Sequence, residues 1–113
     1  MNGAGSIYST LGDMYLYDQA LYTNVLVSQE TLAEAFTSGV LNNGEETAYG
    51  FGFELGEYAG ETYISHSGAW LGFESYYLRF PTRNLSVVVL LNLDYSDEGA
   101  EGLAFSTADL YLK

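Results

Sequence analysis

The hydrophobic pattern of this chain changes at residues 49–55, Tyr-Gly-Phe-Gly-Phe-Glu-Leu. Large apolar residues alternate here with glycine or glutamate, which is the two-residue period of a strand with one buried face. Gly50 and Gly52 would let another group approach the opposite face closely. The stretch therefore predicts the point at which a helical N-terminal part gives way to a β-sheet.

Three further strands are predicted after this one. They cover residues 61–66, 72–80 and 85–93, and the last is nearly all apolar, so we expect it to be covered on both faces. Turn chemistry separates the strands at residues 56–60 and at Pro81-Thr82-Arg83-Asn84. Such short connections favour an antiparallel meander.

Helices are predicted before and after the strands. Thr10 followed by Asp13 resembles a capping box and predicts a helix over residues 11–22, and Ser28 can cap a shorter helix through residue 36. A third helix follows Ser96, with acidic residues at its N-terminus. The residues expected on the apolar faces are Leu11, Met14, Tyr15 and Leu21, then Leu32, Ala35 and Phe36, then Ala100, Leu103, Ala104, Ala108 and Tyr111. The predicted class is α+β, with an antiparallel sheet of about four strands flanked by two N-terminal helices and one C-terminal helix.

The composition is that of an acidic globular chain. At 113 residues and 48% hydrophobic content, residues 1–113 can bury a core as one unit. Fifteen acidic residues against three basic ones give a net charge of −12. Nucleic acids and anionic membrane surfaces are bound by clustered Lys and Arg, so we expect neither as a partner. The acidity favours a solvated surface, and adaptation to high salt is the alternative.

Several other features are excluded by the residue types present. The chain has no Cys, which rules out disulfides and thiol chemistry, and we expect no metal and no cofactor. The longest apolar run, residues 87–91, is too short to span a bilayer. The first residues, Met-Asn-Gly-Ala-Gly, show no secretory signal, and the composition leaves the compartment open.

The single histidine, His66, is the one side chain whose ordinary titration lies near neutral pH. It lies at the end of a predicted strand. A lone histidine beside aromatic residues is more often a hydrogen-bonded structural residue than a functional one. The neighbours favour a site, because they combine close backbone approach, a hydroxyl group and apolar walls: Gly68, Gly72, Ser67, Trp70 and Phe73.

A series of motifs follows along the chain: Gly3-Ala4-Gly5-Ser6-Ile7-Tyr8-Ser9-Thr10, Asp13, Ala20-Leu21, Leu26, Ser28, Tyr49-Gly50-Phe51-Gly52-Phe53, His66-Ser67-Gly68, Gly72-Phe73, Ser75, Arg79, Pro81, Val87-Val88-Val89-Leu90 and Asn92. Taken in order, these motifs resemble the C-terminal part of serine hydrolases of the β-lactamase and penicillin-binding-protein family, in particular the class C-related branch. The resemblance covers residues 3–93, and the order and spacing of the motifs make it specific.

The resemblance implies roles for the residues of its third active-site motif, which lies on the strand that edges the active site. His66 would orient the substrate and support proton movement, and Ser67 would hydrogen-bond a carboxylate or carbonyl of the substrate. Gly68 would allow close backbone approach, and the backbone N–H of Ala69 would be one of two oxyanion-hole donors. Substrate-binding walls would come from Trp70, Gly72 and Phe73.

The family's nucleophile and general base come from a Ser-x-x-Lys box, which this sequence does not contain. The only lysine is Lys113, and residue 110 is leucine. Tyr22-Thr23-Asn24 looks like the family's second motif, but it falls at the end of the first predicted helix, where a helix-ending Asn is the simpler interpretation.

The resemblance therefore implies a C-terminal fragment of a larger domain, inert alone. Its parent would be an extracytoplasmic hydrolase that transfers the acyl group of a small-molecule or peptide ester, amide or β-lactam. A histidine in place of lysine is closer to the broad esterase, peptidase and β-lactamase-related group. The alternative is a non-catalytic binding module with a recognition surface of Trp70, Phe73, Tyr76 and Tyr77. Missing covering elements would leave an open sheet edge and drive self-association.

Overall fold

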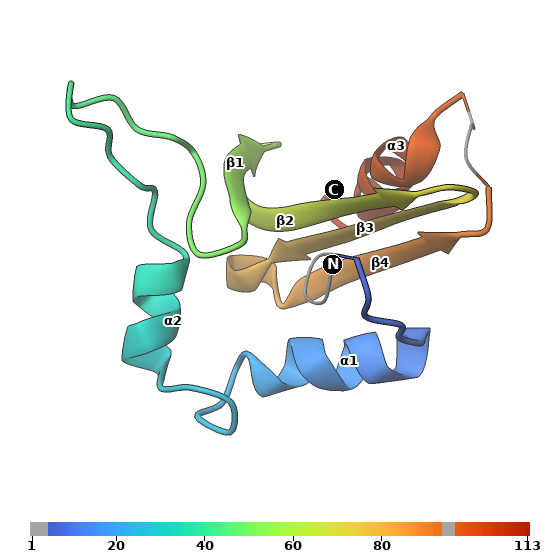
Figure 1. The fold of residues 1–113 in the computed structure, drawn as a ribbon, viewed down its shortest axis with the longest axis horizontal. Helices are drawn as coiled ribbons and strands as arrows, with labels where there is room; N and C mark the ends of the chain where they lie inside the picture. The colour runs from blue at the N-terminus through green and yellow to red at the C-terminus, as the bar shows by residue number, and fades with distance from the viewer. Residues whose placement is uncertain (1–4, 94–96) are drawn as a thin grey trace.

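The computed structural model describes residues 5–93 and 97–113, and within them it has three α-helices and one antiparallel sheet (Figure 1). The helices are α1 (Leu11–Ala20), α2 (Gln29–Ala35) and α3 (Gly99–Ala108). The strands are β1 (Glu54–Tyr58), β2 (Glu61–Trp70), β3 (Phe73–Phe80) and β4 (Leu85–Leu91), in the spatial order β1-β2-β3-β4, with the short 3-10 helix η1 (Pro81–Arg83) before β4. The predicted α+β class is confirmed. Gly3, Ala4 and Ser96 of the predicted motifs lie outside the described residues.

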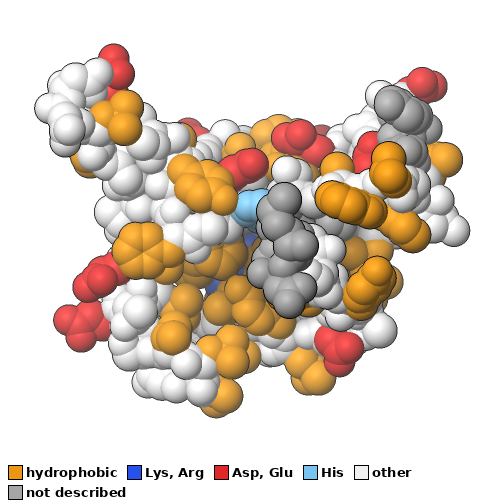
Figure 2. Space-filling model, in the orientation of Figure 1, with side chains coloured by type: hydrophobic (Ala, Val, Ile, Leu, Met, Phe, Trp, Pro, Cys, Tyr) orange, Lys and Arg blue, Asp and Glu red, His pale blue; other side chains and the backbone are white. Residues whose placement is uncertain are grey.

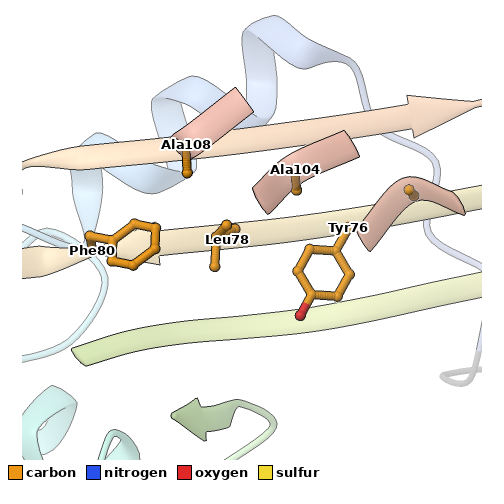
Figure 3. Close-up of a cluster of buried hydrophobic side chains, with 6 residues drawn as sticks. Tyr76, Leu78, Phe80, Ala104 and Ala108 are labelled. Carbon is orange, nitrogen blue, oxygen red and sulfur yellow. The ribbon is translucent and has the colours of Figure 1, made fainter. Parts of the chain in front are cut away.

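Helix α3 covers one face of the sheet, and α1 lies on the other (Figure 1). Every second residue of β3 faces α3, namely Tyr76, Leu78 and Phe80, and these side chains pack against alanines of the helix (Figure 3). The helix presents Ala100, Ala104 and Ala108, all buried, so it can lie close to the strands. Fully burying a side chain such as Leu78 or Phe80 contributes about 1.5–3 kcal/mol each.

The opposite face of the sheet holds a smaller cluster. Tyr77 of β3 packs there with two buried leucines: Leu21, directly after α1, and Leu32 of α2. Val88 of β4 and Phe53 are half-buried around this cluster. Since residues two apart in a strand share a face, Arg79 also lies on this side of β3.

Both predicted helix starts are confirmed by hydrogen bonds. Thr10 Oγ1 accepts from the Asp13 N–H at 3.1 Å and donates to Asp13 Oδ2 at 3.0 Å. Ser28 Oγ accepts from the Thr31 N–H at 3.1 Å. Each cap satisfies a backbone donor that the first turn of a helix leaves unpaired.

The strand predicted over residues 49–55 is wrong for most of its length. Residues 50–53 lie outside the named strands, and β1 instead continues through Tyr58, where a turn was predicted. The reason is that Gly50 packs directly on the end of α2: the Phe51 N–H donates to the Ala35 carbonyl at 2.9 Å, and a Cβ at Gly50 would overlap that same oxygen. The alternation of aromatic residues and glycine therefore belongs to a loop that needs close backbone contact. The turn predicted over residues 56–60 is shorter and consists of Ala59 and Gly60, both at positive φ.

Strand β2 is longer than predicted. It does not end at His66 but runs on to Trp70, which pairs with Phe73 across a two-residue turn. Gly72 in that turn has φ +81°, a left-handed conformation that favours glycine. His66 is thus in the interior of a long strand, and its predicted position at a strand end is wrong.

Some predicted apolar faces are also wrong. Leu11, Tyr15 and Tyr111 are exposed, and Leu103 is 36% exposed. In α1 the buried position is a polar one, Asp18, which explains why apolar spacing misassigned the face. Strand β4 is half-buried and Leu90 is 44% exposed, so this strand is not fully covered on both faces. None of the helices in the described ranges is long and apolar enough to cross a membrane.

Candidate active site

A groove of about 740 Å³ runs along β2 and β3, between the sheet and the segment before α1. Its volume is in the range of sites that hold small molecules. The walls are mostly apolar and aromatic, with His66, Ser67, Glu74 and Ser75 among the polar residues. Figure 2 shows the imidazole, in pale blue, at the surface of this face, next to an acidic side chain in red and close to hydrophobic side chains in orange.

His66 is exposed on β2 and lies opposite Tyr77 of β3. Both of its ring nitrogens make hydrogen bonds: Nδ1 lies 2.6 Å from the Ser67 carbonyl oxygen, and Nε2 lies 2.9 Å from Tyr49 Oη. A carbonyl oxygen can only accept, so Nδ1 carries the proton of the neutral ring. Nε2 is then the acceptor and the Tyr49 hydroxyl is the donor.

Gly68 lies opposite Ser75 in the β2–β3 ladder. A Cβ at Gly68 would overlap Ser75 Oγ, and that hydroxyl is 3.4 Å from the Gly68 carbonyl oxygen. The glycine therefore leaves room for the serine of the neighbouring strand.

Ser67 and Ala69 alternate with His66 and Gly68 along β2, so the two pairs point to opposite faces of the sheet. Even so, all four residues contribute atoms to the groove. Strand β1 pairs with β2 only as far as Glu54 opposite Ser65. Beyond that point the edge of β2 that faces away from β3 has no β1 partner, and backbone groups of a strand edge can then bond a ligand.

The residues predicted to bind substrate divide into two kinds. Trp70 and Phe73 line the groove and are 69% and 57% exposed, respectively. Gly72 does not line the groove, because it forms the turn between them. The structure therefore brings six of the seven predicted site residues to the groove: His66, Ser67, Gly68, Ala69, Trp70 and Phe73.

Sequence reasoning missed several residues of this region. The sequence pattern predicts only a strand face for Tyr49, which belongs to the Tyr49-Gly50-Phe51-Gly52-Phe53 motif, but its hydroxyl contacts the imidazole 17 positions away. Tyr17 of α1 and the segment of Gly5, Ile7, Tyr8 and Ser9 also line the groove. No local pattern could place these residues near His66, because their positions depend on the fold of the whole chain segment that separates them from it.

Tyr22 and Asn24, the lookalike of a second motif, do not line the groove. The Arg79 guanidinium carbon lies 4.0 Å from the centre of the Tyr22 ring, and Asn24 Oδ1 accepts from the Gln29 N–H at 2.9 Å. Both side chains thus have structural contacts outside the groove. The interpretation of Asn24 as a helix-ending residue is wrong, because α1 ends at Ala20 and Asn24 bonds to the first residue of α2.

Residues 5–93 and 97–113 contain no group of three or more His, Asp or Glu side chains placed to hold a metal ion.

Comparison with known proteins places these features in a family. A sequence model described as Beta-lactamase matches residues 1–112. The chain belongs to the beta-lactamase family. One relative in this family, penicillin-binding protein 4* of Bacillus subtilis (strain 168), is 32% identical over 99 residues, which make up 87% of this chain and 22% of that protein. The putative penicillin-binding protein PbpX of the same organism is 39% identical over 71 residues, or 63% of this chain and 16% of that protein.

Membership of the beta-lactamase family confirms the resemblance read from the motifs. The chain spans about a fifth of the length of the curated relatives it matches. The similarity to these relatives therefore extends over only part of each protein.

Proposed function

We propose that this chain is the C-terminal part of a serine hydrolase domain, in which it forms one wall of an active site for acyl transfer. The parent would act on a small-molecule or peptide ester, amide or β-lactam. The main support for the proposal is the position of His66. This residue lies in the middle of β2, and its exposed imidazole is on the wall of a largely aromatic groove. Family membership supports the same reaction class.

Each motif residue has a role in this proposal. His66 supports proton movement, and Ser67 hydrogen-bonds a carbonyl or carboxylate of the substrate. Gly68 allows close approach to the backbone of β2, and the Ala69 N–H donates to the oxyanion that forms in the transition state. The edge of β2 beyond Ser65 does not pair with β1, which supports a backbone donor at this place. Trp70 and Phe73 provide apolar contact for the substrate.

The nucleophile and base belong to the part of the parent outside this chain. An oxyanion donor accelerates the reaction only when a nucleophile is present to create the oxyanion. We therefore expect the chain alone to give no sustained turnover of a chromogenic ester or a chromogenic β-lactam. Turnover by pure material at a constant rate would overturn the assignment of the nucleophile to the rest of the parent.

The decisive experiment uses the full-length parent. His66→Ala should lower kcat/KM by about 10²-fold or more, which is the usual contribution of a positioned acid or base. Thr62→Ala is the matched control, because Thr62 is exposed on the same strand but does not line the groove. Equal activities of the two variants would overturn the proposal.

A binding module is the second candidate, favoured by the exposed side chains around the β2–β3 turn, Trp70, Leu71 and Phe73. The larger recognition surface expected from the sequence is wrong, because Tyr76 and Tyr77 are only 3% and 7% exposed. The reading frame of the parent separates the candidates. A Ser-x-x-Lys box upstream, followed by Tyr-x-Asn or Tyr-x-Ser, supports the hydrolase, and its absence supports the module.

A further inference from the structure

The contact between Tyr49 and His66 leaves no ring nitrogen of the imidazole without a hydrogen bond. We propose that Tyr49 is a positioning residue: its hydroxyl fixes the tautomer and orientation of His66 and controls access to Nε2. The inference rests on the proposed function only for its catalytic consequence. The tautomer itself is a property of this chain.

The backbone of Tyr49 is held from two sides. The Gly39 N–H donates to the Tyr49 carbonyl at 2.9 Å, and Thr47 Oγ1 donates to the same carbonyl at 3.1 Å. Tyr49 also forms an isolated bridge with Glu54 at the start of β1. The phenol therefore reaches the imidazole from a fixed backbone, with the two rings edge to face and their centres 6.1 Å apart.

The two hydrogen bonds act together on the ring. The Ser67 carbonyl accepts the Nδ1 proton, and the Tyr49 hydroxyl donates to the Nε2 lone pair. The Ser67 carbonyl selects the tautomer with its basic nitrogen at Nε2, because a carbonyl oxygen can only accept. The Tyr49 hydroxyl then reinforces this tautomer by donating to Nε2. Since the phenol covers that nitrogen, a proton can reach Nε2 only when Tyr49 swings away or passes its own proton to the ring while its oxygen takes another.

The tautomer can be measured directly, because His66 is the single histidine of the chain. Nitrogen-15 NMR of the neutral imidazole should show the proton at Nδ1. Tyr49→Phe removes the donor and keeps the ring, so the Nε2-protonated form should rise several-fold. Tyr58→Phe is the matched control: it removes an equivalent phenol bond, 3.0 Å to Asp109, and should leave the imidazole signals unchanged.

Two results would overturn the inference: a proton at Nε2 in the unmodified chain, or no change in Tyr49→Phe. Circular dichroism checks that each variant is folded. Should the isolated chain not fold, the same spectra are recorded on the histidine-labelled parent, where the His66 signals are those lost in His66→Gln.

A kinetic readout separates this inference from the proposed function. In the parent, Tyr49→Phe should lower kcat by about tenfold and alter its pH profile, with KM unchanged within about twofold, because a wrong histidine tautomer slows chemistry rather than binding. If His66→Ala abolishes activity while Tyr49→Phe changes neither kcat nor the tautomer, the inference fails and the hydrolase proposal stands. If the tautomer responds but His66→Ala has no effect on activity, the hydrolase proposal fails instead.

Discussion

The Tyr77 hydroxyl donates a hydrogen bond of 2.6 Å to Asp18 Oδ1, which joins the sheet to helix α1 across 59 positions of the sequence. Ser86 of β4 donates to the same oxygen at 2.6 Å, and Arg79 Nε lies 3.5 Å from it. Asp18 and Arg79 expose only 4% and 2% of their surface. At 3.5 Å the arginine contact is mainly electrostatic, and the guanidinium also lies over the Tyr22 ring. One carboxylate thus connects α1 to two strands.

We expect Asp18→Asn to destabilise the chain strongly. The substitution keeps the size of the side chain but leaves the charge of Arg79 buried without its partner, which typically costs about 3–5 kcal/mol. Urea unfolding followed by circular dichroism measures the free energy. The control is Glu61→Gln, which breaks the more exposed pair of Glu61 with Arg83 at 3.1 Å and should cost far less, because water screens an exposed ion pair. Equal losses in both variants would contradict the central role of the buried pair.

The buried phenols predict a loss of stability at alkaline pH. Burial raises the pKa of Tyr76 to about 12, and burial together with the hydrogen bond to Asp18 raises the pKa of Tyr77 as well. Phenols in the unfolded chain titrate near pH 10, so above about pH 10 the unfolded state loses these protons first. This stabilisation is therefore fully present below about pH 10 and is lost as pH rises through about 12.

The test for the buried phenols follows the melting temperature and the tyrosinate absorbance together from neutral to alkaline pH. Tyr77→Phe should flatten the alkaline fall in melting temperature, whatever it does to stability at pH 7. Tyr15→Phe, at an exposed position, should keep the slope of the unmodified chain. If the melting temperature falls with alkaline pH at the same slope in both variants, the ionisation of the buried Tyr77 is not the cause of the fall.

Two glycines should respond to alanine in opposite directions. At Gly50 the new Cβ would overlap the Ala35 carbonyl oxygen and approach the Thr37 carbonyl, so we expect a loss of about 1–3 kcal/mol from overpacking. At Gly12, inside α1, the nearest atom is Thr10 Oγ1 at an ordinary 3.7 Å, and alanine should stabilise the helix by about 0.5–1 kcal/mol. Melting temperatures of the two variants check both signs. A stable Gly50→Ala protein would show that the loop does not need its contact with α2.

Self-association is expected when the chain is alone in solution. Within the described residues β4 has a strand neighbour on one side only, and Leu90 on this strand is 44% exposed. Open edges and apolar surface of this kind pair with a second copy. Light scattering should show oligomers at high concentration. Leu90→Lys should dissociate them, while Leu71→Lys, in the exposed β2–β3 turn, should not. A strict monomer at all concentrations would rule the expectation out.

Local patterns were reliable where the interaction itself is local. The caps at Thr10 and Ser28 bond to residues three positions away, so the sequence contains both partners within one turn. The alternation of residues 49–55 was misleading, because the contact that decides the structure of this stretch is not local. An aromatic and glycine alternation describes a strand and a tightly packed loop equally well, and only the position of the α2 carboxyl end at Ala35 distinguishes them.

The sequence by itself determined the α+β class, both N-terminal helix starts, the family and the His66-Ser67-Gly68 motif, because these follow from caps, alternation and motif order along the chain. Only the tertiary structure decided that β2 runs through that motif to Trp70, that Tyr49 covers the imidazole, and that Asp18 rather than an apolar residue anchors α1. The physical reason is that each of these contacts joins residues 17 or 59 positions apart or depends on strand register. Register and loop packing are set by the whole folded core, so no short segment encodes them.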